Sequence, residues 1–133
     1  MFEKKILAGS ISLAFGAISL YKSLGSFIFI FFNSGFFIIY FIIPLIAGIL
    51  LIRAYYAYIY SKDYFRNNMF FGSILFTLNN IGFILSNLYM GYNNITIVYI
   101  FPSVIMFIIS IIFTIFIILN WSEFEDIKRD LEG

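Results

Sequence analysis

Residues 70–89 read FFGSILFTLNNIGFILSNLY, an apolar run that polar residues interrupt at helical spacing. On an α-helix, Gly72, Asn79 and Ser86 recur at intervals of seven residues and therefore lie on one face. Ser73, Asn80 and Asn87 form a second series with the same spacing beside the first. The candidates for helix packing or ligand binding are Ser73, Thr77, Asn79, Asn80 and Asn87. The stretch predicts a transmembrane helix with one polar face, against which neighbouring helices dock.

The composition of the chain is that of an integral membrane protein. Of its 133 residues, 62% are hydrophobic and 11% are charged, and the mean hydropathy is +1.01. A soluble domain of this size could not bury so much apolar surface, because a small domain leaves a large share of its area in water. We therefore expect an all-α protein, a four-helix transmembrane bundle in a prokaryotic cell membrane, whose lipids contact most of its surface.

The apolar runs predict four membrane-spanning helices within a single domain, residues 1–133. Turn signals at residues 33–35 and 91–94 and a polar loop at residues 61–68 separate these runs. The predicted helices cover residues 6–27, 36–58, 69–89 and 95–119, and residues 122–133 form a short charged tail. Within this tail, the spacing of Ser122 and Glu125 fits a helix N-terminus, so we expect a solvated helical extension.

The first predicted helix carries a face of small residues. Ala8, Ser12 and Gly16 recur at four-residue spacing, which lets another helix approach the backbone closely. Lys22 follows the apolar residues 6–21, whose rise of about 24 Å is short of a hydrocarbon core roughly 30 Å thick. We expect Lys22 to extend its ammonium group to the outer interface as an anchor.

Two prolines and two further anchors mark the second and fourth predicted helices. Pro44 and Pro102 fall inside these helices, where a proline removes a backbone hydrogen bond and is expected to produce a kink. Arg53 stands among tyrosines and Trp121 follows the last apolar run, both of which are typical of the membrane interface. These residues predict where the helices bend and where they leave the lipid.

The distribution of cations predicts the orientation of the chain. With four spans and a cytoplasmic N-terminus, seven of the eight Lys and Arg residues lie on the cytoplasmic side, and only Lys22 lies outside. Both termini are therefore expected to be cytoplasmic. Each half of the chain reads as a glycine-containing helix, a turn and a proline-containing helix, which is compatible with two tandem hairpins of the same orientation.

The residue types that most membrane enzymes and transporters require are missing from this sequence. The chain has no Cys and no His, which excludes disulfides, thiolate metal sites and imidazole catalysis, so we expect neither an enzyme nor a bound cofactor or metal. The net charge of +1 gives no indication of nucleic-acid binding. The chain resembles small multidrug resistance transporters in size and helix count only, because the glutamate of their first helix has no counterpart in residues 6–27.

A surface that is almost entirely apolar and offers no catalytic groups favours an accessory role. We expect a non-catalytic accessory or structural subunit of a larger membrane complex, whose partners are membrane lipids and other membrane subunits or further copies of the chain. The alternative is a small oligomeric channel or transporter lined by the polar face of residues 69–89. In the accessory interpretation, Asn79 and Asn80 face the small residues of the first helix. Gly72 and Asn80 face protein, and Leu75, Leu78 and Leu85 turn toward lipid or a partner.

Overall fold

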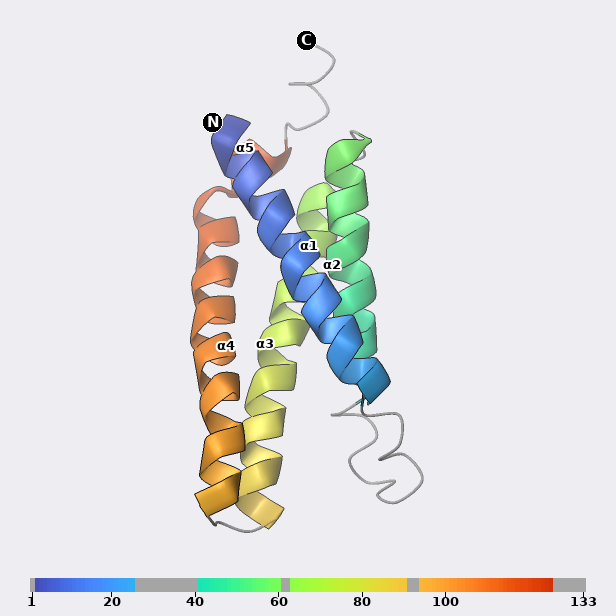
Figure 1. Ribbon diagram of the computed structural model, residues 1–133. Helices are drawn as coiled ribbons and strands as arrows, with labels where there is room; N and C mark the ends of the chain where they lie inside the picture. The colour runs from blue at the N-terminus through green and yellow to red at the C-terminus, as the bar shows by residue number, and fades with distance from the viewer. Residues whose placement is uncertain (1, 26–40, 61–62, 91–93, 126–133) are drawn as a thin grey trace.

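The computed structural model describes residues 2–25, 41–60, 63–90 and 94–125 of the chain. Its helices are α1 (Phe2–Gly25), α2 (Ile43–Ile59), α3 (Phe65–Met90), α4 (Asn94–Leu119) and the short α5 (Trp121–Glu125) (Figure 1). Helices α1, α3 and α4 contain apolar segments long enough to cross a membrane, whereas α2 is apolar but has 17 residues. The structure therefore confirms an all-helical protein whose long apolar helices suit a bilayer.

The helix boundaries differ from the sequence prediction mainly at the start of α3. This helix begins at Phe65, so the second half of the predicted polar loop is helical. Phe65 and Met69 lie one turn apart and are both fully buried, which means that the first turn packs against the core. The predicted turn at residues 33–35 lies outside the described part of the chain, and Asn94 of the second predicted turn begins α4.

Pro44 stands in the first turn of the α-helical part of α2, and a kink there stays a prediction. The α-helix begins at Ile43, directly after the π-helical residues Phe41 and Ile42. A proline is tolerated in the first helical turn because its missing N–H has no intrahelical partner there. Residues 36–40 of the predicted span lie outside the described residues, whereas α4 continues as a helix on both sides of Pro102, so a kink there stays a prediction.

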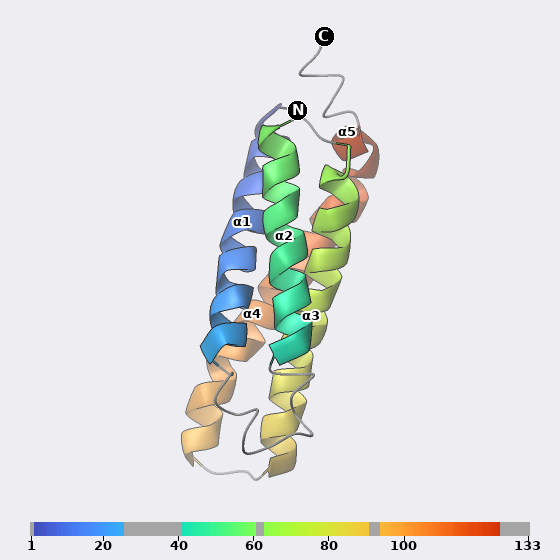
Figure 2. The ribbon, with the colours of Figure 1, turned by 90° about the vertical axis from the view of Figure 1, so that its right-hand side faces the viewer.

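The four long helices run alternately up and down. Helix α2 packs between α1 and α3, and α3 packs against α4 on its other side (Figures 1 and 2). The first residues of α1 and the short helix α5 lie at the same end of the bundle, which we call the α5 end (Figure 1). At this end, the ammonium group of Lys4 donates a hydrogen bond of 3.1 Å to the side-chain oxygen of Asn120.

Hydroxyl groups join α1 to α2. Three buried serines of α1 donate to backbone carbonyl oxygens of α2 and of the π-helical residues before it: Ser12 to Leu51 at 2.7 Å, Ser19 to Pro44 at 2.6 Å and Ser23 to Phe41 at 3.0 Å. As the donor advances seven residues from Ser12 to Ser19, the acceptor retreats seven residues from Leu51 to Pro44. From Ser19 to Ser23 the donor advances four residues and the acceptor retreats three, so the antiparallel register is kept to within one residue.

Glycines bring the two backbones of this interface together. A Cβ atom on Gly48 would lie 2.6 Å from Cγ of Leu20 and 3.1 Å from the carbonyl oxygen of Gly16. A Cβ on Gly16 would in turn lie 3.2 Å from the carbonyl oxygen of Gly48. The small-residue face of α1, which includes the fully buried Ala8 and Ser12, therefore packs against α2. This corrects the expectation that it meets the third helix, because α2 also offers small residues at the matching positions.

Removing the three buried hydroxyls should weaken the α1–α2 interface without changing its shape. We expect the combined variant Ser12→Ala, Ser19→Ala and Ser23→Ala to lose about 2 kcal/mol of stability, because interhelical hydrogen bonds in membranes average about 0.6 kcal/mol and reach about 1.7. The free energy of unfolding, measured by steric trapping in bicelles, would report this loss. Ser10→Ala is the matched control, since Ser10 is exposed on the same helix. A combined variant as stable as Ser10→Ala would contradict the prediction.

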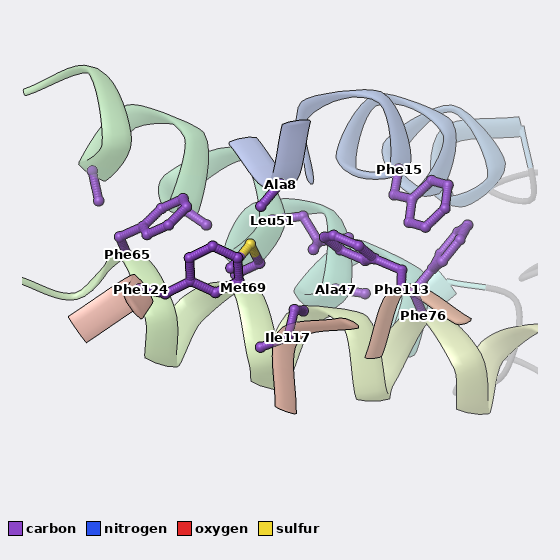
Figure 3. Close-up of a cluster of buried hydrophobic side chains, with 12 residues drawn as sticks. Ala8, Phe15, Ala47, Leu51, Phe65, Met69, Phe76, Phe113, Ile117 and Phe124 are labelled. Atoms are coloured by element: carbon purple, nitrogen blue, oxygen red, sulfur yellow. The ribbon is translucent and has the colours of Figure 1, made fainter. Parts of the chain in front are cut away.

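A cluster of aromatic rings holds α1, α3 and α4 together. Phe15 of α1 stacks on Phe76 of α3 at a centroid distance of 4.9 Å and meets Phe113 of α4 edge to face at 5.4 Å (Figure 3). Both geometries are the ones that aromatic quadrupoles favour. Phe15 thus connects α1 to α4, two helices that are not neighbours along the chain.

A second aromatic cluster closes the α5 end. Phe124 is 1% exposed and contacts Phe65 at a centroid distance of 5.9 Å (Figure 3). It also contacts Phe116, at 5.8 Å. The guanidinium of Arg66 lies 4.2 Å from the ring centroid of Trp121 and donates to its carbonyl oxygen at 3.2 Å. The described part of the predicted tail is therefore a helix that packs on the bundle and not a solvated extension, because its one aromatic side chain is buried.

Candidate functional site

The polar face of α3 lies inside the bundle. Ser73 and Asn80 are fully buried, Asn79 is 3% exposed, and Thr77 is half-buried. Asn87 also belongs to α3, but its side chain is outside the described residues. The four described candidates thus share a surface that faces other helices.

The half of this face nearer the α5 end is taken up by hydroxyl contacts with α4. Thr114 of α4 donates a hydrogen bond of 3.1 Å to the hydroxyl oxygen of Ser73 and is also 2.8 Å from the carbonyl oxygen of Ser110. Thr77 bonds to the carbonyl oxygen of Ser73 at 2.8 Å. Because these hydroxyls bond to one another and to helix backbone, this part of the face serves packing. The sequence signal for the partner was the spacing of Ser110 and Thr114 on one face of α4.

The other half of the face is occupied by Lys22. Its ammonium nitrogen donates a hydrogen bond of 2.8 Å to Oδ1 of Asn80 and lies 5.7 Å from the ring centroid of Phe76. The structure therefore turns the side chain of Lys22 toward α3, and its place at the outer interface of a membrane stays a prediction. A buried amide oxygen offers the ammonium group a stronger interaction than the lipid beside it.

The orientation of α3 agrees with most of the sequence prediction. Gly72 is buried against α2, where an added Cβ would lie 2.7 Å from Cγ of Leu51 and 3.1 Å from its backbone nitrogen. Leu78 and Leu85 are exposed on the outer side, as expected. Leu75 differs, because it is half-buried and packs against the core.

The other predicted anchors have partners at the α5 end. The guanidinium of Arg53, which is exposed, lies 5.0 Å from the ring centroid of Tyr64. Trp121 is half-buried beneath Arg66 and meets Phe70 edge to face at 5.1 Å. Both arrangements combine a cation with an aromatic ring near helix ends, and their depth in a membrane stays a prediction.

Two apolar grooves open on the sides of the bundle. One, of about 180 Å³, lies between α3 and α4 and is lined by Ile74, Thr77, Leu78, Ile111, Thr114 and Ile115. The other, of about 200 Å³, lies between α1 and α4 and is lined by Ile11, Phe15, Ile109, Ile112, Phe113 and Phe116. The hydroxyls of Thr77 and Thr114 bond to helix backbone, so both grooves present hydrocarbon to whatever occupies them.

The described part of the chain holds no cluster of three or more His, Cys, Asp or Glu residues that could bind a metal ion. What the structure assembles on this face is a half-buried cation, Lys22, on the buried amide of Asn80. Comparison of the chain with protein-family models, with curated protein sequences and with solved structures gives no match.

Proposed function

We propose that the protein is a non-catalytic accessory subunit of a larger membrane complex, to which it presents α4. The single observation that carries this proposal is the exposed face of α4, a broad surface of large aliphatic and aromatic side chains. Its members include Phe101, Ile105, Ile108, Ile112, Ile115, Ile118 and Leu119. Helix α4 lies at one side of the bundle and packs along its length mainly on α3, so most of its circumference is available to a partner.

The chemistry of this face suits a helix partner. In a bilayer, lipid tails are as apolar as the face itself, so helices associate through close packing and not through the hydrophobic effect. Isoleucine has one strongly preferred χ1 rotamer in a helix, and it therefore loses little conformational freedom when a partner packs against it. A rigid isoleucine surface is a favourable docking surface for a complementary helix.

The orientation that we propose places both termini in the cytoplasm, with α1–α2 and α3–α4 as hairpins of the same direction. In support, the described cations Lys4, Arg53 and Arg66 lie near the α5 end, together with the beginning of α1. The excess of Lys and Arg marks the cytoplasmic side of a membrane protein.

The alternative function is a small oligomeric channel or transporter lined by the polar face of α3. Such a channel needs polar groups along a continuous path, whereas Ser73 and Thr77 bond within the α3–α4 interface. This contact pattern favours the accessory role. Flux through liposomes that contain the purified protein, abolished by Asn80→Leu, would favour the channel.

Photo-crosslinking from α4 tests the accessory role. We expect benzoylphenylalanine at Ile108 or Ile115, which are 51% and 49% exposed, to form an adduct with a different protein in native membranes. The same probe at Leu7, which is 52% exposed on α1, is the matched control and should react with lipid. Mass analysis of the adducts gives the answer. Lipid adducts alone from α4 would contradict the proposal, and an adduct of two copies of this chain would favour the oligomeric alternative.

A further inference from the structure

Among the described residues, the acidic ones stand far from the ammonium group of Lys22. The sequence has no Asp or Glu between Glu3 and Asp63, or between Asp63 and Glu123. Glu3 lies nineteen residues before Lys22 on α1, which corresponds to about 28 Å along the helix axis. Asp63 precedes Asn80 by seventeen residues, or about 25 Å, and Glu123 belongs to α5 at the far end. A partly buried ammonium group without a counter-charge is costly in a membrane, so a negative charge from outside the chain would be stabilised here.

The groups around this charge are hydrogen-bond donors. The bond from Lys22 to Oδ1 of Asn80 uses one of the three N–H groups of the ammonium. Asn80 is fully buried, and within the described part of the chain its Nδ2 has no hydrogen-bond partner. Because Oδ1 and Nδ2 share one carbon atom, Nδ2 lies within about 5 Å of the ammonium nitrogen. Two nitrogens at this separation can donate to one oxyanion.

The apolar groove between α1 and α4 lies on the α5-end side of this donor pair, separated from it by the ring of Phe76. Lys22 lies over Phe76, Phe76 stacks on Phe15, and Phe15 lines the groove between α1 and α4. Phe15 and Ile11 precede Lys22 by seven and eleven residues, or about 10 and 16 Å along α1. One half of a hydrocarbon core is about 15 Å thick, so the groove lies at the depth that an acyl chain reaches below its headgroup.

We propose that Lys22 and Asn80 bind the phosphate of a phospholipid, one acyl chain of which lies in the α1–α4 groove. The depth of Lys22 is compatible with this assignment. Lys22 follows Lys5 by seventeen residues, which span about 26 Å along the helix axis. This length approaches the roughly 30 Å that separates the two headgroup layers of a bilayer. The lipid therefore belongs to the leaflet opposite the α5 end, and its phosphate supplies the negative charge that the described residues do not place beside Lys22. This site does not depend on the accessory role.

Native mass spectrometry of the full chain in mild detergent, titrated with phosphatidylglycerol, tests the proposal. The wild-type protein should bind one lipid with higher affinity than it binds diacylglycerol with the same chains. Asn80→Asp supplies an internal carboxylate to Lys22, so the fold should be kept while lipid affinity falls by about tenfold or more. If Lys22 and Asn80 formed only a contact between helices, Asn80→Asp would leave lipid affinity unchanged, and this result would overturn the proposal.

The groove is tested separately from the charge. Ile112→Trp fills the α1–α4 groove and should weaken binding several-fold, whereas Ile108→Trp, exposed on the same helix but outside both grooves, should not. Millimolar inorganic phosphate that displaced the lipid completely would assign the site to free phosphate and overturn the part played by the acyl chain.

A membrane protein that co-purifies with wild type but not with Lys22→Gln, with lipid binding unchanged in that variant, would assign the charge to a partner's carboxylate and overturn the proposal. Thermal unfolding of each variant confirms that it is folded.

Discussion

A Gly48→Leu variant is expected to lose the close contact between α1 and α2 and to be destabilised by about 3 kcal/mol or more. The first added atom already lies 2.6 Å from Cγ of Leu20 and 3.1 Å from the backbone oxygen of Gly16. The leucine side chain can move, but a helix backbone can yield only by translation of the whole helix. Such a translation also breaks the serine bonds to α2 that begin at Ser12, which adds to the cost.

The free energy of unfolding in bicelles, measured by steric trapping, would show this effect. Gly25→Leu is the matched control, because no atom lies within 4 Å of the Cβ position at Gly25. Gly48→Ala should fall between wild type and Gly48→Leu, since it adds one atom where Leu20 is able to give way. If Gly48→Leu unfolds with the same free energy as Gly25→Leu, the α1–α2 contact is not the one described.

Truncation of Phe15 to alanine should have the largest effect of the remaining single substitutions, about 2 kcal/mol. In water-soluble cores a Phe→Ala change costs about 3–5 kcal/mol, part of which is transfer of the side chain from water. In a membrane that part disappears, because the separated helix keeps its phenyl ring in lipid. The remaining cost is the cavity beside Phe76 and Phe113 and the two lost ring contacts.

The same unfolding measurement distinguishes this buried ring from lipid-facing residues of α1. Leu13→Ala is the control, since Leu13 is 37% exposed on the same helix and its removal leaves no enclosed cavity. Phe15→Leu should recover part of the loss by filling some of the volume. Equal stability of Phe15→Ala and Leu13→Ala would show that Phe15 does not connect α1 to α3 and α4.

Much of the candidate site could be predicted from residues 70–89 alone. A seven-residue repeat of small and polar residues on an apolar helix indicates a face that avoids lipid, and the burial of Ser73, Asn79 and Asn80 agrees with it. The role of Lys22 could not be predicted in this way. Its long side chain can reach outward to an interface or inward to a neighbour, and Asn80 lies 58 positions away in the chain.

The sequence by itself determined three features: that the protein is helical and apolar enough for a membrane, approximately which residues form its long helices, and which face of α3 is polar. These features are accessible because hydrophobicity and helical period are local properties. Only the tertiary structure decided that the small face of α1 packs on α2 and that Lys22 meets Asn80. In lipid, every outward face of a helix is equally well solvated, so hydrophobic pattern does not select its neighbour. The choice depends on where Gly16 and Gly48 allow two backbones to touch and on which amide then comes within reach of a single cation.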